Sequence, residues 1–496
     1  MKAHRIILLA AVAFAAPTHA VPNTDMSAFQ QAIGGYFEAL RKDAYAPPGF
    51  AVVVVQGDRT VFARAYGLRD IQAKAPLSLH DPIYVGSSTK AYTGLLAAEL
   101  DRQAIVPLST TLKDVWPSLT LPDGLDPSAV SAAKLLSHSA PISDNGLAFI
   151  SNATGDWTVE SVPAHLAKYA RPMTKPFQYS NFGPFLYSVM VEKRTGLRWR
   201  DALRRYVLQP LGLKETSARI EDFGADRIGR CNTVSASASG WQQVAPKPSP
   251  LLNAAGGVYA SGNDVAAFLK AFTSEGRSEQ GRIPASSLAK TVEPLSNQDS
   301  ETWGFHRLQY GLGWDLATYK AEPMWLRAGV YSGCRAMLAI FPRQKLGIGV
   351  LTLSDVAGNG FNASAVQEIF DTWARAPNAP SEAVSRIAAF HGDALKSAAE
   401  LRKPVAPGIS ISPTVLRQYT GRYHSDRLGM MNVKVSGGKL RGVLGLFELD
   451  LTPTAPDRFE NQAGLELEVE PVTFTRDSAG RVIAMSWGDR PFTRID

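Results

Sequence analysis

The chain has 496 residues, a length that accommodates roughly two or three domains with sizeable cores. Hydrophobic residues make up 45% and charged residues 20%, as in ordinary globular proteins, so a fibrous or disordered chain is excluded. The formal net charge of +7 is modest, and no basic cluster is interleaved with aromatic residues. A nucleic-acid partner is therefore not expected.

The first 20 residues have the features of a secretory signal peptide. Lys2 and Arg5 form a basic start, residues 6–16 are apolar, and residues 18–20 provide a small-x-small cleavage site. We expect cleavage after Ala20 and a periplasmic or secreted mature protein. No later run approaches the roughly 20 apolar residues of a spanning helix, so no integral membrane segment is expected after cleavage.

The cysteine and histidine content gives no indication of a metal or cofactor. Cys231 and Cys334 are too few for a disulfide scaffold and lack metal-ligand spacing. Whether they are bridged stays open, since an oxidising compartment would permit one disulfide. The eight histidines form no cluster with ligand spacing.

The elements before the first motif are a helix over about 26–41 and a β-hairpin. The hairpin strands are 50–55 and 60–66, joined by a turn at residues 56–59. Residues 52–55 are valines, apolar on both faces, which predicts a sheet covered by helices on at least one side.

An apolar run at 83–85 then leads through Gly86 into a helix that starts at Ser87. A serine in the first turn of a helix lies where free N–H groups and the helix dipole stabilise a developing anion. Lys90 is one turn further along, within reach of the Ser87 hydroxyl. Burial would lower the pKa of the lysine ammonium and allow it to accept the serine proton.

This S-x-x-K pattern is weak when taken alone. It occurs four times, and the matches at Ser131, Ser287 and Ser436 fit a capping serine with a surface lysine, or a glycine turn. Ser87 differs because it follows a small residue after a strand-like run and has suitable partners downstream.

Two further motifs supply those partners. Tyr179-Ser180-Asn181 offers a tyrosine to act as base and then acid, and an amide to bind a substrate carbonyl. Arg327-Ala328-Gly329-Val330 offers a cation and a backbone N–H on a strand that would complete an oxyanion hole with Ser87. Each also has a purely structural interpretation, as aromatic packing at a helix start and as a solvated strand charge.

Strand-like runs at 324–330, 335–341 and 346–353 predict a meander. Together with the hairpin near the N-terminus they would close one antiparallel sheet, with the helical middle of the chain as a lobe against it.

After a Pro-rich boundary the pattern changes to short strands with turns. We expect a signal peptide at 1–20, a first domain at 21–375, a linker with a helix at 376–412 and a small all-β barrel-like domain at 413–496. The expected strands lie at 419–423, 430–435, 439–443, 447–451, 465–470 and 482–486.

In combination the motifs resemble those of the serine β-lactamase-like hydrolases, which include penicillin-recognising enzymes, class C β-lactamases, D-aminopeptidases and related esterases. Ser87–Lys90 resembles the first motif of the family, Tyr179–Asn181 the second, and Arg327–Gly329 stands where the family has Lys-Thr-Gly or His-x-Gly. Supporting stretches lie at 135–139, 210–213, 255–258 and 310–314. The likeness covers about residues 28–372, and the tail resembles the lipocalin-like domains of some members.

The resemblance implies an α+β fold, a β-lactamase/transpeptidase-like domain with a helical lobe, followed by a lipocalin-like domain. It implies Ser87, Lys90 and Tyr179 as catalytic residues, with Asn181, Arg327, Gly329 and Val330 binding the substrate and no metal or cofactor. The chain departs from the family at 139–141, where Ser-Ala-Pro replaces Thr-Ser-Gly and His138 is expected to be structural. Arg327 keeps the positive charge but cannot lose its proton, which favours a substrate with a free carboxylate.

The function expected first is an exported serine peptidase or amidase of the S12 type, acting on short linear peptides with D-residues or a free carboxylate. A carboxylesterase comes second and a β-lactamase third. A penicillin-binding or sensor module that acylates without turnover is the alternative from another class. The sequence leaves the substrate, the role of the C-terminal domain and the oligomeric state open.

Overall fold

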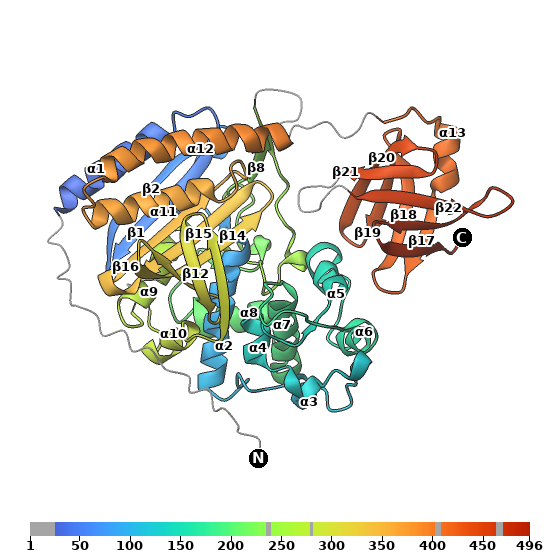
Figure 1. Cartoon of the computed structure of the whole chain (residues 1–496), viewed down its shortest axis with the longest axis horizontal. Helices are drawn as coiled ribbons and strands as arrows, with labels where there is room; N and C mark the ends of the chain where they lie inside the picture. The colour runs from blue at the N-terminus through green and yellow to red at the C-terminus, as the bar shows by residue number, and fades with distance from the viewer. Residues whose placement is uncertain (1–24, 235–239, 278–280, 402–407, 463–469) are drawn as a thin grey trace, which may run out of the picture.

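The computed structural model describes residues 25–234, 240–277, 281–401, 408–462 and 470–496, so the expected signal peptide lies outside the described residues. Figure 1 shows a larger body of helices and strands followed by a separate small barrel. Among the described residues, no helix combines the length and the apolar composition needed to cross a membrane.

A nine-stranded antiparallel sheet forms the centre of the larger body. Its strand order is β11-β12-β13-β14-β15-β16-β1-β2-β3, so the hairpin from the start of the chain joins the meander from its later part. Strand β1 pairs with β16 from Phe50↔Thr352 to Gln56↔Leu346, so the two ends of this domain contribute to one continuous sheet, as expected. The strands are β1 (Gly49–Gln56), β2 (Arg59–Asp70), β3 (Ala75–Pro76), β11 (Ser296–Thr302), β12 (Phe305–Tyr310), β13 (Asp315–Tyr319), β14 (Glu322–Tyr331), β15 (Cys334–Phe341) and β16 (Leu346–Thr352).

Helices cover both faces of this sheet. On one face lie α1 (Met26–Leu40), α11 (Gly360–Trp373) and α12 (Ala379–Leu401), and on the other lies α9 (Gly262–Thr273) (Figure 1). The valines of β1 alternate accordingly: Val52 and Val54 belong to one hydrophobic core, Val53 and Val55 to the other. The valine run of β1 is therefore apolar on both faces because helices cover both sides of the sheet, as the sequence predicted.

The middle of the chain forms a helical lobe against the second face. Helix α2 (Thr89–Arg102) runs between lobe and sheet and is buried from Thr89 to Leu100. Around it lie α3 (Leu112–Val115), α4 (Ala132–Leu136), α5 (Asn145–Phe149), α6 (Ser161–Tyr169), α7 (Phe182–Thr195), α8 (Trp199–Leu203) and α10 (Ala285–Thr291). Short strands on this side are β4 (Ile83–Tyr84), β5 (Ile142–Ser143), β6 (Arg171–Pro172), β7 (Thr216–Ser217) and β10 (Tyr259–Ala260). The hairpin of β8 (Asn232–Val234) and β9 (Trp241–Gln243) instead contributes Val234 and Trp241 to the core on the α1 and α11 side.

Helix α12, expected as part of a linker, packs into the core of the larger body. Its Phe390 ring meets Phe361 of α11 at 5.5 Å between centroids. The buried Arg386 guanidinium bonds Glu368 of α11 at 2.5 Å and also bonds Asp371. A buried charge network and an aromatic contact therefore hold α12 against α11.

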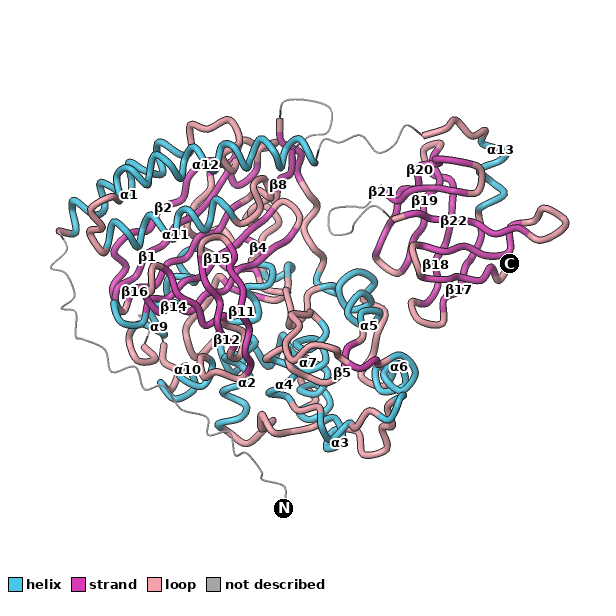
Figure 2. The backbone as a smooth tube through the Cα atoms, in the orientation of Figure 1, coloured by secondary structure: helices cyan, strands magenta, loops and turns pink. Residues whose placement is uncertain are grey.

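The C-terminal domain is a closed eight-stranded antiparallel barrel in which β17 pairs with β24 (Figure 2). Its strands are β17 (Gly421–Ser425), β18 (Gly429–Ser436), β19 (Lys439–Leu444), β20 (Phe447–Ala455), β21 (Arg458–Gln462), β22 (Pro471–Arg476), β23 (Val482–Trp487) and β24 (Arg490–Arg494), preceded by α13 (Pro413–Leu416). The all-β expectation is confirmed, although β21, β22 and β24 were not foreseen, because these strands themselves hold few apolar residues. Most of the strand expected at 465–470 lies outside the described residues.

The barrel is docked onto the helical lobe at α5 and α6. Arg427 of the barrel bonds the buried Asp144 at 3.3 Å, and Lys168 of α6 bonds Asp426 at 2.9 Å. Figure 1 shows α5 and α6 on the side of the lobe that faces the barrel. The two domains therefore share an interface next to the helical lobe.

Candidate active site

The predicted nucleophile stands on a tight turn between β4 and α2. Gly86 opens a 3₁₀ turn, Gly86–Ser88, with φ of +51°, a left-handed conformation that glycine adopts without a steric penalty. The turn runs directly into α2, so Ser87 and Lys90 are one helical turn apart. Lys90 Nζ lies 3.1 Å from Ser87 Oγ and donates a hydrogen bond to it.

Lys90 is buried, with 2% of its surface exposed. Besides Ser87, its ammonium donates to Asn181 Oδ1 at 2.8 Å and to the Ala255 carbonyl at 2.7 Å. Burial lowers the pKa of Lys90, and the Arg327 cation lowers it further, although Tyr179 acts in the opposite direction. A lysine with a lowered pKa in contact with a serine hydroxyl can act as its general base.

Tyr179 lies over this pair from the loop before α7. Its ring centroid is 4.8 Å from Lys90 Nζ and 5.1 Å from Arg327 Cζ. Burial of its hydroxyl group raises the pKa, but the charges of Arg327 and Lys90 and hydrogen bonds to Lys90 and Ser87 lower the pKa of Tyr179 below its usual value overall. The residue as a whole is 42% exposed, so a substrate can reach its ring.

Arg327 lies behind Tyr179 rather than in the open pocket. It is 5% exposed, donates from Nη1 to the Tyr310 hydroxyl at 2.8 Å, and lies 3.4 Å from Asp315 Oδ2. Its Nη2 reaches the Tyr179 hydroxyl at 3.5 Å. The guanidinium thus pairs inside the protein, and it does not line the cavity at Ser87.

His138 and Tyr310 hold the tyrosine in place. The ring of His138 lies 4.6 Å from that of Tyr179 and 4.8 Å from that of Tyr310. The Ser180 N–H donates to His138 Nδ1 at 3.3 Å, and burial holds the histidine pKa well below its ordinary value. A neutral, structural His138 agrees with the sequence analysis. Tyr310 and Asp315 were not singled out there, because only the fold brings them to Arg327.

Asn181, the first residue before α7, completes the group around Lys90. Because its Oδ1 accepts from Lys90, its amide NH₂ is available to another acceptor. Asn181 is exposed and lines a cavity of about 910 Å³ together with Ser87, Tyr179 and Val330. A volume of this size accommodates a drug-sized ligand or a short peptide.

Strand β14 borders the nucleophile turn at very close range. A Cβ atom on Gly86 would lie 2.9 Å from the Val330 nitrogen, and one on Gly329 would lie 1.9 Å from the Val85 carbonyl oxygen. Only glycines permit this approach. In the described residues, the pairing of β13 with β14 ends at Asp315↔Leu326, so the Arg327–Tyr331 segment runs past the turn without a strand on that side. Val330 itself is 54% exposed.

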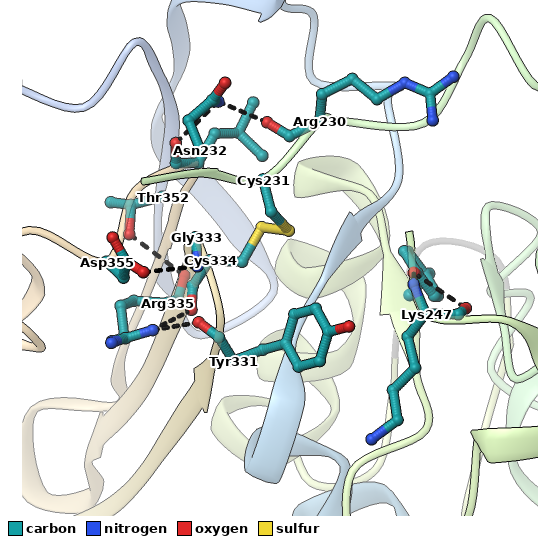
Figure 3. Close-up of a disulfide and its surroundings, with 12 residues drawn as sticks. Arg230, Cys231, Asn232, Lys247, Tyr331, Gly333, Cys334, Arg335, Thr352 and Asp355 are labelled. Atoms are coloured by element: carbon teal, nitrogen blue, oxygen red, sulfur yellow. Dashed lines mark hydrogen bonds between the residues drawn. A yellow bond between two sulfur atoms is a disulfide. The ribbon is translucent and has the colours of Figure 1, made fainter. Parts of the chain in front are cut away.

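The Cys231–Cys334 pair, left open above, forms a disulfide that holds the far wall of the cavity (Figure 3). It joins the start of β8 to the β14–β15 turn, and the Gly333 N–H donates to Asp355 Oδ2 at 3.0 Å. Arg335 and Lys247 line the cavity on this side. The Lys247 ammonium lies 5.5 Å from the ring centroid of Tyr331. Neither cation carried a motif that sequence analysis could have used.

The part of the chain that the structure describes holds no group of three or more His, Cys, Asp or Glu side chains suited to a metal ion. The side chains gathered at Ser87 supply a hydroxyl, a buried amine and a phenol.

Comparison with known proteins adds the family context. A family model described as Beta-lactamase matches residues 31–368, which is more than half of the chain. Among curated relatives, "Penicillin-binding protein 4" of Amycolatopsis lactamdurans is 25% identical over 333 residues, covering 66% of this chain and 85% of that protein.

Two solved structures show the same fold. The octameric penicillin-binding protein homologue from Pyrococcus abyssi matches with a TM-score of 0.54 and 20% identity, over 95% of this chain and 100% of that one. The D-amino acid amidase from Ochrobactrum anthropi SV3 matches with a TM-score of 0.58 and 19% identity, over 70% of this chain and 99% of that one. The first of these likenesses extends over the barrel as well as the larger body.

Proposed function

The chain belongs to the beta-lactamase family, and from this premise we propose that it is an exported serine peptidase or amidase that acts on short linear peptides through an acyl-enzyme on Ser87. The observation that carries the proposal is the hydrogen bond from the buried Lys90 ammonium to Ser87 Oγ at 3.1 Å. A desolvated amine next to a serine hydroxyl at the start of a helix is suited to nucleophilic catalysis.

In the acylation step, Ser87 Oγ attacks the substrate carbonyl carbon and the C–N bond breaks. Lys90, in its neutral form, or the Tyr179 phenolate takes the serine proton, and the protonated group returns it to the leaving nitrogen. The pKa values of both groups are lowered, which makes these basic forms more accessible at a given pH than in a free lysine or tyrosine. Water then attacks the ester by the same route in reverse and releases the acid.

The backbone N–H groups of Ser87 and Val330 form the oxyanion hole in this mechanism. Support comes from the close approach of Gly86 to Val330 and from the open side of β14 beyond Leu326. A peptide in extended conformation can align with that side of β14 and hydrogen-bond to its backbone. The Asn181 amide is placed to donate to a second carbonyl of the peptide. These features favour a peptide or amide over a simple ester.

Arg327 acts in this proposal through Tyr179. Its guanidinium is occupied by Asp315 and Tyr310, so direct binding of a substrate carboxylate requires it to exchange those partners. Its constant positive charge instead stabilises the phenolate form of Tyr179. A substrate with a free carboxylate remains part of the proposal.

A covalent probe tests the nucleophile. Fluorophosphonate or β-lactam labelling of the purified protein should give one adduct on Ser87, located by mass spectrometry, and Ser87→Ala should abolish it. Ser131→Ala is the matched control, since Ser131 also has a lysine three residues later and should leave labelling unchanged. An adduct on any other serine would refute the site.

A turnover screen tests the substrate class. It compares linear peptides with L- or D-residues at either end, p-nitrophenyl esters and nitrocefin, each with the Ser87→Ala control. Peptide cleavage with little nitrocefin turnover is the expected result. Fast ester hydrolysis with inert peptides would replace the peptidase proposal by an esterase, and slow release of a stable adduct would indicate a non-turnover module.

A further inference from the structure

The cavity at Ser87 is not built by the catalytic domain alone. Three residues of the barrel line it, namely Leu446, Phe447 and Glu448, all at the turn between β19 and β20. Phe149 of α5 lines the same cavity from the catalytic side. Two domains that are far apart in the chain therefore share one wall of the candidate active site.

The turn is fixed against the catalytic domain by its backbone. Leu444 pairs with Phe447, so the turn proper consists of Gly445 and Leu446. The Leu446 N–H donates to the Thr154 carbonyl at 3.4 Å. Gly445 has φ of +59°, and a Cβ atom there would lie 2.7 Å from the same carbonyl oxygen. Such a contact leaves little freedom to the position of the turn.

Aromatic packing fixes the apolar part of this wall. The rings of Phe149 and Phe447 meet edge to face at 5.5 Å, and Phe447 stacks on the fully buried Trp487 at 5.7 Å. Phe149 also meets Trp487 at 5.4 Å. Pairs of this kind add to the free energy of burial and restrict ring orientation.

Leu446 is the feature that points to a ligand. Turns of small barrels normally carry polar residues, yet this leucine is 53% exposed at the rim of the cavity. The charged neighbour Glu448 bonds Arg441 of the barrel at 3.0 Å. When a ligand covers a half-exposed apolar side chain, apolar surface is removed from water, and this burial makes binding more favourable.

We propose that the β19–β20 turn completes an apolar subsite, formed by Phe149, Leu446 and Phe447, that binds a bulky hydrophobic group adjoining the scissile bond. The inference rests on the proposed function, because it takes the cavity at Ser87 as the place of reaction. It names the substrate class more closely: peptides or amides with a large apolar side chain next to the cleaved bond.

Leu446→Ala tests the subsite with little risk to folding, since the side chain is half-exposed. The values of kcat/KM are measured for two ester series, one with growing acyl groups on p-nitrophenol and one with growing aryl groups on acetate. We expect a loss of about tenfold for the bulkiest member of one series, and less than twofold for p-nitrophenyl acetate. Ile483→Ala is the control, because Ile483 of β23 is a residue of the same size, 44% exposed, and lies outside the cavity; this variant should change neither series.

A second test measures the rate at which Ser87 is covalently labelled, which does not require turnover of a substrate. Fluorophosphonates with short and long alkyl groups are compared on Ser87 by mass spectrometry, and Leu446→Ala should slow the long probe selectively. Equal effects of Leu446→Ala and Ile483→Ala, or equal loss for small and bulky probes, would overturn the subsite while leaving the hydrolase intact. Absence of any Ser87 adduct in the wild type would instead refute the proposed function itself.

Discussion

The electrostatics of the site depend on two cations on either side of one phenol. Lys90 Nζ and Arg327 Cζ lie 4.8 and 5.1 Å from the ring centroid of Tyr179. The two cations lower the pKa of Tyr179 although burial raises it. The pKa of Lys90 is lowered mainly by burial, and the Arg327 charge lowers it further. The arginine is the member that never changes its charge.

Replacing Arg327 by Gln should therefore move the pH dependence of the reaction. Loss of the cation raises the pKa of both Tyr179 and Lys90, so their basic forms appear only at higher pH. The ascending limb of the pH profile of kcat/KM should shift to higher pH. Arg327→Lys retains a charge and should shift it less. An unchanged limb in Arg327→Gln would exclude the electrostatic role assigned to Arg327.

The residues of the site differ in how far the sequence could reveal them. Ser87, Lys90, Tyr179 and Asn181 belong to short motifs, and the structure brings all four into one cluster. Arg327 was also foreseen, but its burial was not, because its partners Asp315 and Tyr310 carry no motif of their own. Pairing between strands, rather than spacing along the chain, determines which groups an arginine meets.

Among the elements, the β14–β15 turn is held by a covalent bond to a distant part of the chain. The Cys231–Cys334 disulfide joins positions that are 103 apart in the sequence and ties this turn to the start of β8. The turn begins at the end of β14, close to Val330, so the same bond supports one wall of the cavity and the strand that carries the proposed oxyanion donor. The sequence left this pairing open because two cysteines alone do not define a bridge.

Replacement of both cysteines by serine should lower the free energy of unfolding of the first domain by about 2–5 kcal/mol. Chemical denaturation with and without dithiothreitol measures the effect. The wild type should become less stable in the reductant, whereas Cys231→Ser/Cys334→Ser should not respond to it. A wild-type unfolding curve that is the same in both buffers would show that the bridge does not stabilise the domain.

Elements with strong periodicity or two-sided apolar runs were predicted well, and those defined by tertiary contact were not. The sheet, the β1–β2 hairpin and the barrel class all follow from local patterns. Helix α12 was predicted as a helix within a linker, but its packing on α11 was not foreseen, because it depends on Arg386 meeting carboxylates of α11.

At the scale of the whole molecule, the barrel is a second wall of the active site and not only an appendage. Its docking combines ion pairs at Asp144 and Asp426 with aromatic contacts at Phe149. The sequence could not predict this role, since nothing in a strand pattern tells which turn of a barrel meets another domain. An apolar Gly-Leu-Phe turn is the one local signal that was available.

Two glycines of the barrel allow the docking to be tested apart from barrel stability. Gly445→Ala and Gly438→Ala both place a Cβ at a positive φ, +59° and +76°, and should destabilise the barrel to a similar extent. Only the Gly445 variant brings that Cβ against Thr154, whereas nothing lies within 4 Å at Gly438. We expect faster proteolysis between the domains and a raised KM for bulky substrates in Gly445→Ala alone. Identical behaviour of the two variants would contradict the docking contact.

The pairing of β1 with β16 has a consequence for the order in which the enzyme matures. Strand β1 ends at Gln56 and β16 begins at Leu346, so the ribosome finishes one long before it starts the other. During that interval the valine-rich β1 presents a free edge, the kind of segment that chaperones shield from aggregation. Ser87 and Lys90 are likewise made well before Val330. The nascent polypeptide therefore carries the proposed nucleophile before the proposed oxyanion donor of β14 exists, and the two meet only once β14, β15 and β16 have joined β1 in the sheet.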